Sequence, residues 1–302
     1  MDLYKLSVKE ASELLKKHEI KADELLDSVY ARIEAVDGKL GAYISLCREK
    51  AESMAKSAQS KIDNGEAGAL TGIPAGIKDN ICTKGIATTC ASKMLENFIP
   101  PYNATVIEKL ESSGAVITGK LNMDEFAMGG STETSYFKKC ANPWDITRVP
   151  GGSSGGSASA VASGEALFAL GSDTGGSIRQ PASFCGVVGL KPTYGAVSRF
   201  GLVAFASSLD QIGPITRTVE DSAIVLNAIC GADSRDSTCA DYKHPDYTAD
   251  IDRGVKGMKI GIPTQYIGDG LDPDVKEAVL RDAKHFEDLG AKCDEVLLPD
   301  AD

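Results

Sequence analysis

The sequence predicts an α/β protein in which a central sheet is covered by helices on both faces. From residue 70 onward, segments with the apolar patterning of strands alternate with segments of helical spacing. Such alternation is typical of a sheet that buries both of its faces under helices. Hydrophobic residues make up 42% of the chain and charged residues 25%, which is ordinary globular usage. No apolar run approaches the ~18 residues that a membrane span needs.

Helices are expected to come first, in residues 1–66. Ser7 and Glu10 have the capping-box pattern that starts a helix. A polar helix is expected over residues 48–64, ended by Gly65. Apolar residues at helical spacing lie between them: Leu25, Leu26, Val29 and Ile33. This segment is expected to flank the core.

The core is predicted over residues 67–232. Its expected elements are strand 73–77, a helix after Asn103, strand 115–118, helix 154–163, strands 167–170 and 187–190, and a helix that starts at Thr218. Residues 233–302 are expected to begin with an aspartate-rich surface excursion over 233–257. Strand 258–263, helix 273–289 and strand 295–298 are expected to follow. We predict one domain over residues 1–302.

Two glycine-rich turns each contain a serine. The first reads Pro-Gly-Gly-Ser-Ser-Gly-Gly-Ser from Pro150, and the second reads Asp-Thr-Gly-Gly-Ser-Ile-Arg from Asp173. Glycine permits a positive φ and close approach to a ligand, and free N–H groups ahead of a helix suit negative charge. This arrangement indicates a serine nucleophile with an oxyanion hole, and hence acyl transfer.

No histidine is expected to serve as the base for such a serine. His18, His244 and His285 all lie in polar or charged segments and are interpreted as surface residues. Lys78 ends a predicted strand, and burial can lower the pKa of a lysine until its neutral amine acts as a base. The alternative is a lysine that extends to solvent and pairs with Asp79.

Three motifs together resemble the amidase signature family: Gly-Ile-Lys-Asp-Asn over 76–80, the serine turn over 151–157, and the second turn over 173–179. The resemblance implies a mixed central sheet and a Ser-Ser-Lys triad. By motif position, Ser177 would be the nucleophile, Ser153 the bridging serine and Lys78 the base. The backbone N–H groups of Thr174, Gly175 and Gly176 would hold the oxyanion.

The family resemblance also suggests a substrate loop. Its residues are Met128, Gly129, Gly130 and Ser131, whose main-chain groups would bind the amino end of the substrate. The alternative is a plain helix cap, because glycine favours caps as well.

Charged residues near the two motifs have less direct roles. Asp173 and Arg179 flank the nucleophile turn, and we expect them to pair and hold it. Asp124 and Glu125 resemble acids or metal ligands, but we interpret them as charges at a helix N-terminus. No metal site is expected.

Within the family, the chain most resembles the amidase subunits of amidotransferases that act on Glu-tRNA(Gln) or Asp-tRNA(Asn). This resemblance rests on residues 120–135, 141–145 and 191–211. It implies that the chain hydrolyses glutamine and passes ammonia to partner subunits B and C. No cofactor would bind this subunit, since ATP and Mg would be used by the partner that holds the aminoacyl-tRNA. A stand-alone amidase for a small amide is the main alternative.

Charge and cysteine content agree with this division of labour. The net charge of −11 argues against a chain that grips tRNA by itself, because phosphates require clustered lysine and arginine. The second alternative, a phosphate-binding protein, lacks the P-loop lysine. Eight scattered cysteines without a C-x-x-C pair are interpreted as reduced thiols, with Cys185 as a packing residue. The first residues do not resemble a signal peptide, so a cytoplasmic protein is expected.

The chain is expected to be incomplete at its C-terminal end. Family members continue for well over a hundred residues past this point, including the groups that grip the α-carboxylate and α-amino group of glutamine. We therefore expect residues 233–302 to be the start of an unfinished C-terminal portion.

Overall fold

Three helices cover one flank of the computed structural model, which describes residues 1–241 and 243–299. They are α1 (Val8–Lys16), α2 (Ala22–Leu40) and α3 (Arg48–Asp63), with a short 3₁₀ turn at Leu3–Lys5. The capping box is confirmed, because the Ser7 side chain accepts from the Glu10 N–H while the Glu10 carboxylate accepts from the Ser7 N–H. The apolar face of α2 is buried in the core, as the helical spacing predicted.

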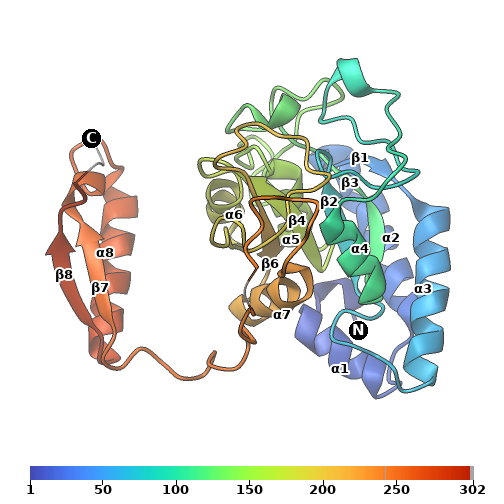
Figure 1. Ribbon diagram of the computed structural model, residues 1–302. Coiled ribbons are helices and arrows are strands. Elements are labelled where there is room, and N and C mark those ends of the chain that lie inside the picture. Colours follow the sequence, from blue (N-terminus) through green and yellow to red (C-terminus); the bar gives the residue numbers. More distant parts are fainter. Residues whose placement is uncertain (242, 300–302) are drawn as a thin grey trace. The chain divides into compact units, whose positions relative to one another are not determined.

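The central sheet is mixed, as expected. Its strands lie in the order β1-β3-β2-β4-β6-β5 (Figure 1). Strands β3, β2 and β4 run parallel, and β1, β6 and β5 join antiparallel to their neighbours. The strands are β1 (Tyr43–Leu46), β2 (Pro74–Lys78), β3 (Val116–Leu121), β4 (Phe168–Asp173), β5 (Val188–Gly189) and β6 (Gln211–Thr216).

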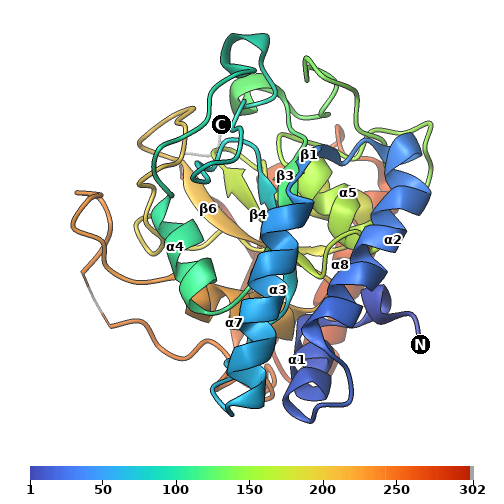
Figure 2. The ribbon, with the colours of Figure 1, turned by 90° about the vertical axis from the view of Figure 1, so that its right-hand side faces the viewer.

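Helices cover both faces of this sheet because successive crossovers run in opposite directions. Helix α4 (Thr105–Ser112) leads from β2 to β3 on one side, and α5 (Gly155–Ser163) leads from β3 past β2 to β4 on the other. Parallel crossovers are right-handed, so a reversal of direction places the two helices on opposite faces. Figure 2 shows α4 and α5 on the two sides of the strands. Helices α6 (Arg179–Cys185) and α7 (Val219–Ile229) complete this part of the chain.

Strand β6 is a feature that the sequence did not predict. Its Gly213 and Pro214 are typical of turns, since proline cannot donate to a sheet ladder. The Pro214 carbonyl accepts from the Leu190 N–H, so the Pro214 nitrogen faces the same side as β5. Strand β5 has already ended there, at Gly189. The missing N–H of the proline therefore affects only the edge of the sheet, beyond the end of β5.

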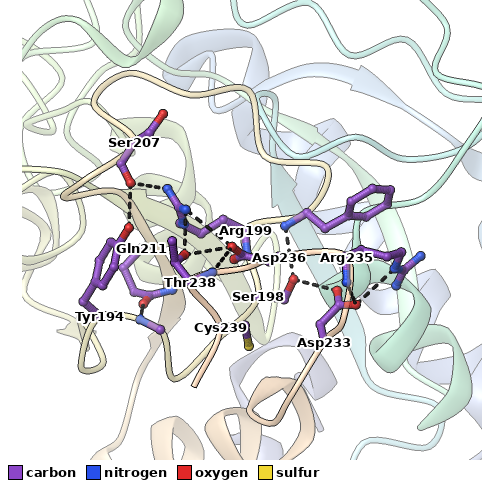
Figure 3. A network of polar contacts seen from close by, with 12 residues as sticks. Tyr194, Ser198, Arg199, Ser207, Gln211, Asp233, Arg235, Asp236, Thr238 and Cys239 are labelled. Carbon is purple, nitrogen blue, oxygen red and sulfur yellow. Dashed lines mark hydrogen bonds and ion pairs between the residues drawn. The ribbon is translucent and has the colours of Figure 1, made fainter. Parts of the chain in front are cut away.

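Residues 233–257 contain no helix or strand within the described part of the chain, yet their start is not a simple surface excursion. The carboxylates of Asp233 and Asp236 are buried. Asp236 pairs with Arg199, and Asp233 accepts from Ser198 and from Arg235 (Figure 3). The predicted surface role is wrong for these two residues, because local composition does not reveal partners more than thirty residues away.

The chain divides into two units, Met1–Thr248 and Ala249–Asp302. The second unit has parallel strands β7 (Lys259–Pro263) and β8 (Lys292–Val296) joined through α8 (Pro273–Asp288), with a short 3₁₀ turn at Thr264–Tyr266. Two further 3₁₀ turns, at Lys93–Leu95 and Glu125–Ala127, belong to the first unit. Its strands and helix follow the predicted order with shifted boundaries. The single domain over residues 1–302 stays a prediction.

A buried ion pair joins β2 to β3 immediately after Lys78. The Nζ of Lys120 lies 3.6 Å from Oδ1 of Asp79, and both side chains are fully buried. Lys120 also donates to the carbonyl of Ile81 (2.6 Å) and to the hydroxyl of Thr88 (2.8 Å). A buried charge that loses its partner is strongly destabilising. This pair therefore fixes the chain that leaves β2.

Lys120→Met is expected to lower the free energy of unfolding by about 3–5 kcal/mol, because it leaves the Asp79 carboxylate buried without a cation. Denaturant unfolding followed by circular dichroism measures this loss. The matched control is Lys139→Met, whose partner Glu133 is 3.6 Å away and whose pair is exposed. An equal effect of both substitutions would contradict the prediction.

Candidate functional site

The two serine turns meet at the carboxyl ends of the parallel strands. One turn precedes α5 and carries Ser153 and Ser154, and the other follows β4 and carries Ser177. The N–H of Ser154 donates to the carbonyl of Ser177 over 3.1 Å, which ties one turn to the other. The peptide bond between Gly152 and Ser153 is cis. In open α/β sheets, this edge is where ligands bind.

Lys78, the last residue of β2, reaches into this junction. Its side chain is fully buried. The Nζ lies 2.8 Å from Oγ of Ser153 and 2.8 Å from Oγ of Ser154. It also lies 2.9 Å from Oγ and 3.2 Å from the carbonyl oxygen of Ser172 in β4. Burial lowers the pKa of Lys78 to about 7, although the carboxylates of Asp124 and Asp173 oppose this shift.

The surrounding hydrogen bonds assign a direction to the lysine lone pair. The hydroxyl of Ser154 donates to the Ser172 carbonyl (3.1 Å), so its oxygen accepts from Lys78. The Ser172 hydroxyl oxygen accepts from Nδ2 of Asn80 over 2.9 Å. A neutral amine has two N–H groups and one lone pair. With the N–H groups directed at Ser154 and Ser172, the lone pair faces the hydroxyl of Ser153.

The alternative pairing of Lys78 with Asp79 is wrong. Asp79 pairs with Lys120 and accepts from the Thr89 backbone N–H over 2.9 Å. Successive side chains along an extended chain point to opposite faces of a sheet, so the side chains of Lys78 and Asp79 point away from each other. Lys78 is thereby left among hydroxyl groups.

Ser177 lies in a half-buried turn, and its hydroxyl makes no hydrogen bond within residues 1–241 and 243–299. A Cβ added at Gly175 would meet no heavy atom within 4 Å. At Gly176, which has a φ of +131°, the nearest such atom is a side-chain carbon of Gln180 at 4.0 Å. The turn is therefore open on the side where a substrate would approach.

One of the expected oxyanion donors is already engaged. The N–H of Gly176 donates to Oδ1 of Asp173 over 2.7 Å. The N–H groups of Thr174 and Gly175 have no backbone partner in the described part of the chain, and neither has that of Ser177. These three remain as the available donors, which corrects the prediction for Gly176. A glycine pattern cannot show which N–H group a neighbouring carboxylate occupies.

Asp173 and Arg179 pair as expected. The guanidinium of Arg179 donates from Nε (3.1 Å) and Nη2 (3.0 Å) to the two carboxylate oxygens of Asp173. Burial alone would raise the pKa of Asp173, but bonds from Arg179 and from the N–H groups of Ile178 and Gly176 together lower it. The carboxylate thus stays ionised and holds the turn.

The predicted substrate loop, residues 128–131, lies against the Ser153 turn. A Cβ added at Gly152 would come within 2.7 Å of the Ser131 nitrogen and 2.9 Å of the Gly130 carbonyl carbon. Gln180 joins the two segments, because its Nε2 donates to the Gly130 carbonyl (3.0 Å) and its Oε1 accepts from the Gly152 N–H (2.8 Å). Met128, Gly129 and Gly130 are exposed and Ser131 is half-buried.

Asp124 is not an ordinary charge at a helix terminus. It precedes the 3₁₀ turn Glu125–Ala127 without capping it, and its side chain is fully buried. Its Oδ1 accepts from the hydroxyl of Thr134 (3.0 Å), and its Oδ2 has no partner in the described residues. Asp124 thus lies at the N-terminus of a helical turn, as interpreted, but the fold encloses it beside Ser153, whose carbonyl accepts from the Asp124 N–H (3.3 Å).

Several residues of this site were missed from the sequence. They are Asn80, Ser154, Ser172 and Gln180. All four lie within or beside the three motifs, which was the only signal available. Cys185 is buried, and burial raises the pKa of its thiol to about 12. It is unpaired like the other cysteines, as predicted.

The three histidines lie in other parts of the chain. His18 follows α1, His244 hydrogen-bonds to Tyr247, and His285 is in the last turn of α8. Within the described residues, no cluster of three or more histidine, cysteine and carboxylate side chains is arranged to hold a metal ion. No helix among those residues is long and apolar enough to cross a membrane.

Comparisons with known proteins place this geometry in context. A family model described as Amidase matches residues 24–302. The A subunit of glutamyl-tRNA(Gln) amidotransferase from Carboxydothermus hydrogenoformans is 60% identical over 300 residues, which are 99% of this chain and 62% of that protein. The protein of the same name from Bacillus velezensis is 57% identical with the same coverage. The chain thus spans about three fifths of the length of these curated relatives.

Solved structures agree with these relatives. A crystal structure of the A subunit of glutamyl-tRNA(Gln) amidotransferase from Thermotoga maritima matches with a TM-score of 0.83 and 45% identity, over 99% of this chain and 63% of that one. The peptide amidase of Stenotrophomonas maltophilia matches with a TM-score of 0.89 and 34% identity, over 98% and 62%. These matches confirm the predicted fold class.

The electrostatics of Lys78 give a testable pH dependence. In the Ser-Ser-Lys triad that the motifs predict, a proton leaves Ser177 by way of Ser153 only when the amine of Lys78 is neutral. The rate at which a fluorophosphonate labels Ser177 is therefore expected to rise with pH through about 7. Asp124 favours the charged amine, so Asp124→Asn lowers the pKa of Lys78 and moves this rise to lower pH.

The matched control is Glu125→Gln, a neighbouring carboxylate that is not among the charges acting on Lys78. It is expected to leave the profile in place. A profile of Asp124→Asn that coincides with the parent, or one that moves to higher pH, would refute this electrostatic role.

Proposed function

Because this chain belongs to the amidase family, as its three motifs predicted, we propose that it hydrolyses glutamine as the amidase subunit of a tRNA-dependent amidotransferase. The observation that carries this proposal is the buried contact of 2.8 Å between Nζ of Lys78 and Oγ of Ser153, in a turn hydrogen-bonded to that of Ser177. The 60% identity to the A subunit of such an amidotransferase supports glutamine and tRNA over other amides. The ammonia released would convert Glu-tRNA(Gln) to Gln-tRNA(Gln).

Acylation would begin at Ser177. Its Oγ attacks the carboxamide carbon of glutamine while its proton passes to Ser153, whose own proton passes to the neutral amine of Lys78. The carbonyl oxygen becomes an oxyanion, and the N–H groups of Thr174, Gly175 and Ser177 stabilise it. Return of the proton through Ser153 to the amide nitrogen breaks the C–N bond. Ammonia leaves, and a glutamyl ester remains on Ser177.

Deacylation uses the same groups in reverse. A water molecule loses a proton to Ser153 and Lys78 as its oxygen attacks the ester carbon. The second tetrahedral intermediate collapses, the C–O bond to Ser177 breaks, and Ser177 regains a proton as glutamate leaves. The pKa of Lys78 near 7 suits both directions of transfer, since a base works best when its pKa lies near the working pH.

The assembly around this chain is part of the proposal. Main-chain groups of Met128, Gly129, Gly130 and Ser131 would bind the amino end of glutamine beside the Ser153 turn. Subunits B and C would be the partners, with the aminoacyl-tRNA, ATP and Mg bound on the partner side. The net charge of −11 agrees with a chain that leaves the tRNA to its partner in the cytoplasm.

A stand-alone amidase is the second candidate, favoured by one observation. The peptide amidase of Stenotrophomonas maltophilia matches this fold with a TM-score of 0.89. A partner-independent enzyme would hydrolyse a small amide at the same rate with or without subunits B and C. A glutaminase of the proposed kind would depend on those subunits and respond to aminoacyl-tRNA.

Ser177→Ala is expected to abolish glutamine hydrolysis and leave the fold intact, because its hydroxyl is not part of the hydrogen-bond network of the described residues. The assay uses the protein at the full length of its relatives, in complex with subunits B and C. Mass spectrometry of the parent during turnover is expected to show a glutamyl adduct on the peptide that contains Ser177.

The matched control is Ser135→Ala, a serine in the half-buried part of the 131–140 loop. It is expected to keep its activity. Full activity of Ser177→Ala, or an adduct on another residue, would exclude Ser177 as the nucleophile.

Lys78→Ala is expected to cause a comparable loss that raising the pH does not rescue, because among the described residues the amine that hydrogen-bonds to Ser153 is that of Lys78. Initial rates between pH 6 and pH 9.5 measure this, at pH values chosen to bracket the pKa of Lys78 at about 7. Activity restored at high pH would instead assign the proton transfer to hydroxide or to a different base.

A further inference from the structure

Asp210 lies beside the nucleophile turn, although it is more than thirty residues away in the sequence. It immediately precedes β6, whose first residue, Gln211, is paired with Asp173 at the end of β4. The side chain of Asp210 is therefore brought opposite Thr174, the first residue after β4. Only 3% of Asp210 is exposed.

The carboxylate of Asp210 receives hydrogen bonds from two segments. The hydroxyl of Thr174 donates to its Oδ1. The N–H of Phe205 donates to Oδ2 over 2.9 Å, and the N–H of Ala206 lies 3.1 Å from Oδ2 and 3.2 Å from Oδ1. Within the described residues, no lysine or arginine forms an ion pair with it. A buried carboxylate satisfied only by such donors ties the loop at residues 205–206 to Thr174.

The loop that carries these donors is itself anchored. The guanidinium of Arg199 donates to the carbonyl of Ser207 and to the hydroxyl of Thr238, and it pairs with Asp236 at 3.4 Å (Figure 3). It also lies over the ring of Tyr194, 5.2 Å from the ring centroid. Asp210, Arg199, Ser207 and Asp236 line one cavity of about 240 Å³. The contacts of Arg199 thus hold in place the loop whose N–H groups bind Asp210, and with it the position of Asp210 opposite Thr174.

The nucleophile turn needs such a support at its first residue. Asp173 fixes the far side of the turn through Gly176, Ile178 and Arg179. Between the two held sides lies Gly175, and glycine has the greatest backbone freedom of all residues. The side chain of Thr174 bonds to Asp210, and this bond limits how its peptide can rotate. The N–H groups of Thr174 and Gly175 are two of the three available oxyanion donors.

We infer that Asp210 is a positioning residue for the oxyanion hole, acting through the hydroxyl of Thr174. Asp173 and Asp210 hold the glycine turn from its two ends, so that its N–H groups point at the developing oxyanion before substrate binds. Preorganised donors cost no reorganisation during the reaction, which is why their orientation affects the rate more than the binding. This inference rests on the proposed function in its use of Ser177 as nucleophile.

A double-mutant cycle tests this coupling. Thr174→Val keeps the shape of the side chain and removes the hydroxyl, whereas Thr174→Ser keeps the hydroxyl. Asp210→Asn replaces one carboxylate oxygen by an NH₂ group, which cannot accept the hydrogen bonds that the Asp210 carboxylate receives from Thr174 and from the N–H groups of Phe205 and Ala206. The kcat and KM for glutamine are measured for each single variant and for the double variant Asp210→Asn with Thr174→Val, in the full-length protein with subunits B and C.

We expect Thr174→Val and Asp210→Asn each to lower kcat on the order of tenfold to a hundredfold, less than the 10²–10³ typical of removing a donor outright. The KM is expected to stay within about threefold, as is the kcat of Thr174→Ser, because only transition-state stabilisation is lost. The double variant is expected to be no slower than the slower single variant, since both act through one contact.

Two controls and one independent readout complete the test. Asp246→Asn and Thr248→Val break a similar Asp–Thr bond of 2.7 Å in an exposed loop and are expected to keep the parent kcat. Thermal unfolding of Thr174→Val separates lost folding from lost positioning. The inference would be overturned if the fold-losses in kcat of the two single variants multiplied in the double variant, or if Thr174→Ser were as slow as Thr174→Val.

Labelling of Ser177 by a fluorophosphonate separates this inference from the proposed function. The label forms a tetrahedral adduct on Ser177 whether or not glutamine is the substrate. A parent that is labelled but does not hydrolyse glutamine refutes the proposed function, and slower labelling of Thr174→Val still supports the role of Asp210. Unchanged labelling of Thr174→Val in an active glutaminase refutes the role of Asp210 alone.

Discussion

The burial of one lysine amine is the constraint on which the rest of the site depends. Lys78 is fully enclosed among the hydroxyls of Ser153, Ser154 and Ser172, and no carboxylate of the described residues forms an ion pair with it. A charged ammonium is costly in such a place, and the pKa of Lys78 falls to about 7 for that reason. Asp79, the next residue in the sequence, is paired with Lys120 and does not pair with Lys78. The sheet thus supplies a buried amine of lowered pKa, which the proposed reaction uses as its base in place of a histidine.

The carboxylates around the site have two different roles. Asp173 and Asp210 accept hydrogen bonds from the nucleophile turn and hold its geometry. The carboxylate of Asp124 instead accepts from Thr134, and its other oxygen has no hydrogen-bond partner among the described residues; it acts on Lys78 through its charge. The proposed reaction uses both effects: the first keeps the oxyanion donors aligned, and the second keeps the pKa of Lys78 from falling further than about 7, so that the amine can still take up a proton.

Much of the fold followed from local chemistry. The capping box at Ser7 and Glu10, the apolar stripe of α2 and the strand that ends at Lys78 were predictable from the sequence, because each depends on neighbours a few residues away. Strand β6 was not, since Gly213 and Pro214 are typical of turns, and only the sheet shows that the nitrogen of Pro214 faces the edge beside the short β5. The buried carboxylates of Asp233 and Asp236 were missed in the same way, because their partners come from other loops.

The sequence by itself determined which chemical groups the site contains: a lysine at a strand end, serines in two glycine turns, and the carboxylate and arginine that flank the second. Motif order was enough for that, since turn geometry and side-chain chemistry are local properties. Only the tertiary structure decided which of them touch. Lys78 lies 75 residues from Ser153 and 94 from Ser172 in the chain, and strand order alone brings them within hydrogen-bond distance. The same packing removed the water that would have kept the lysine charged, and it occupied the N–H of Gly176 with Asp173. Desolvation and partner choice depend on residues distant in sequence, so no local pattern could reveal them.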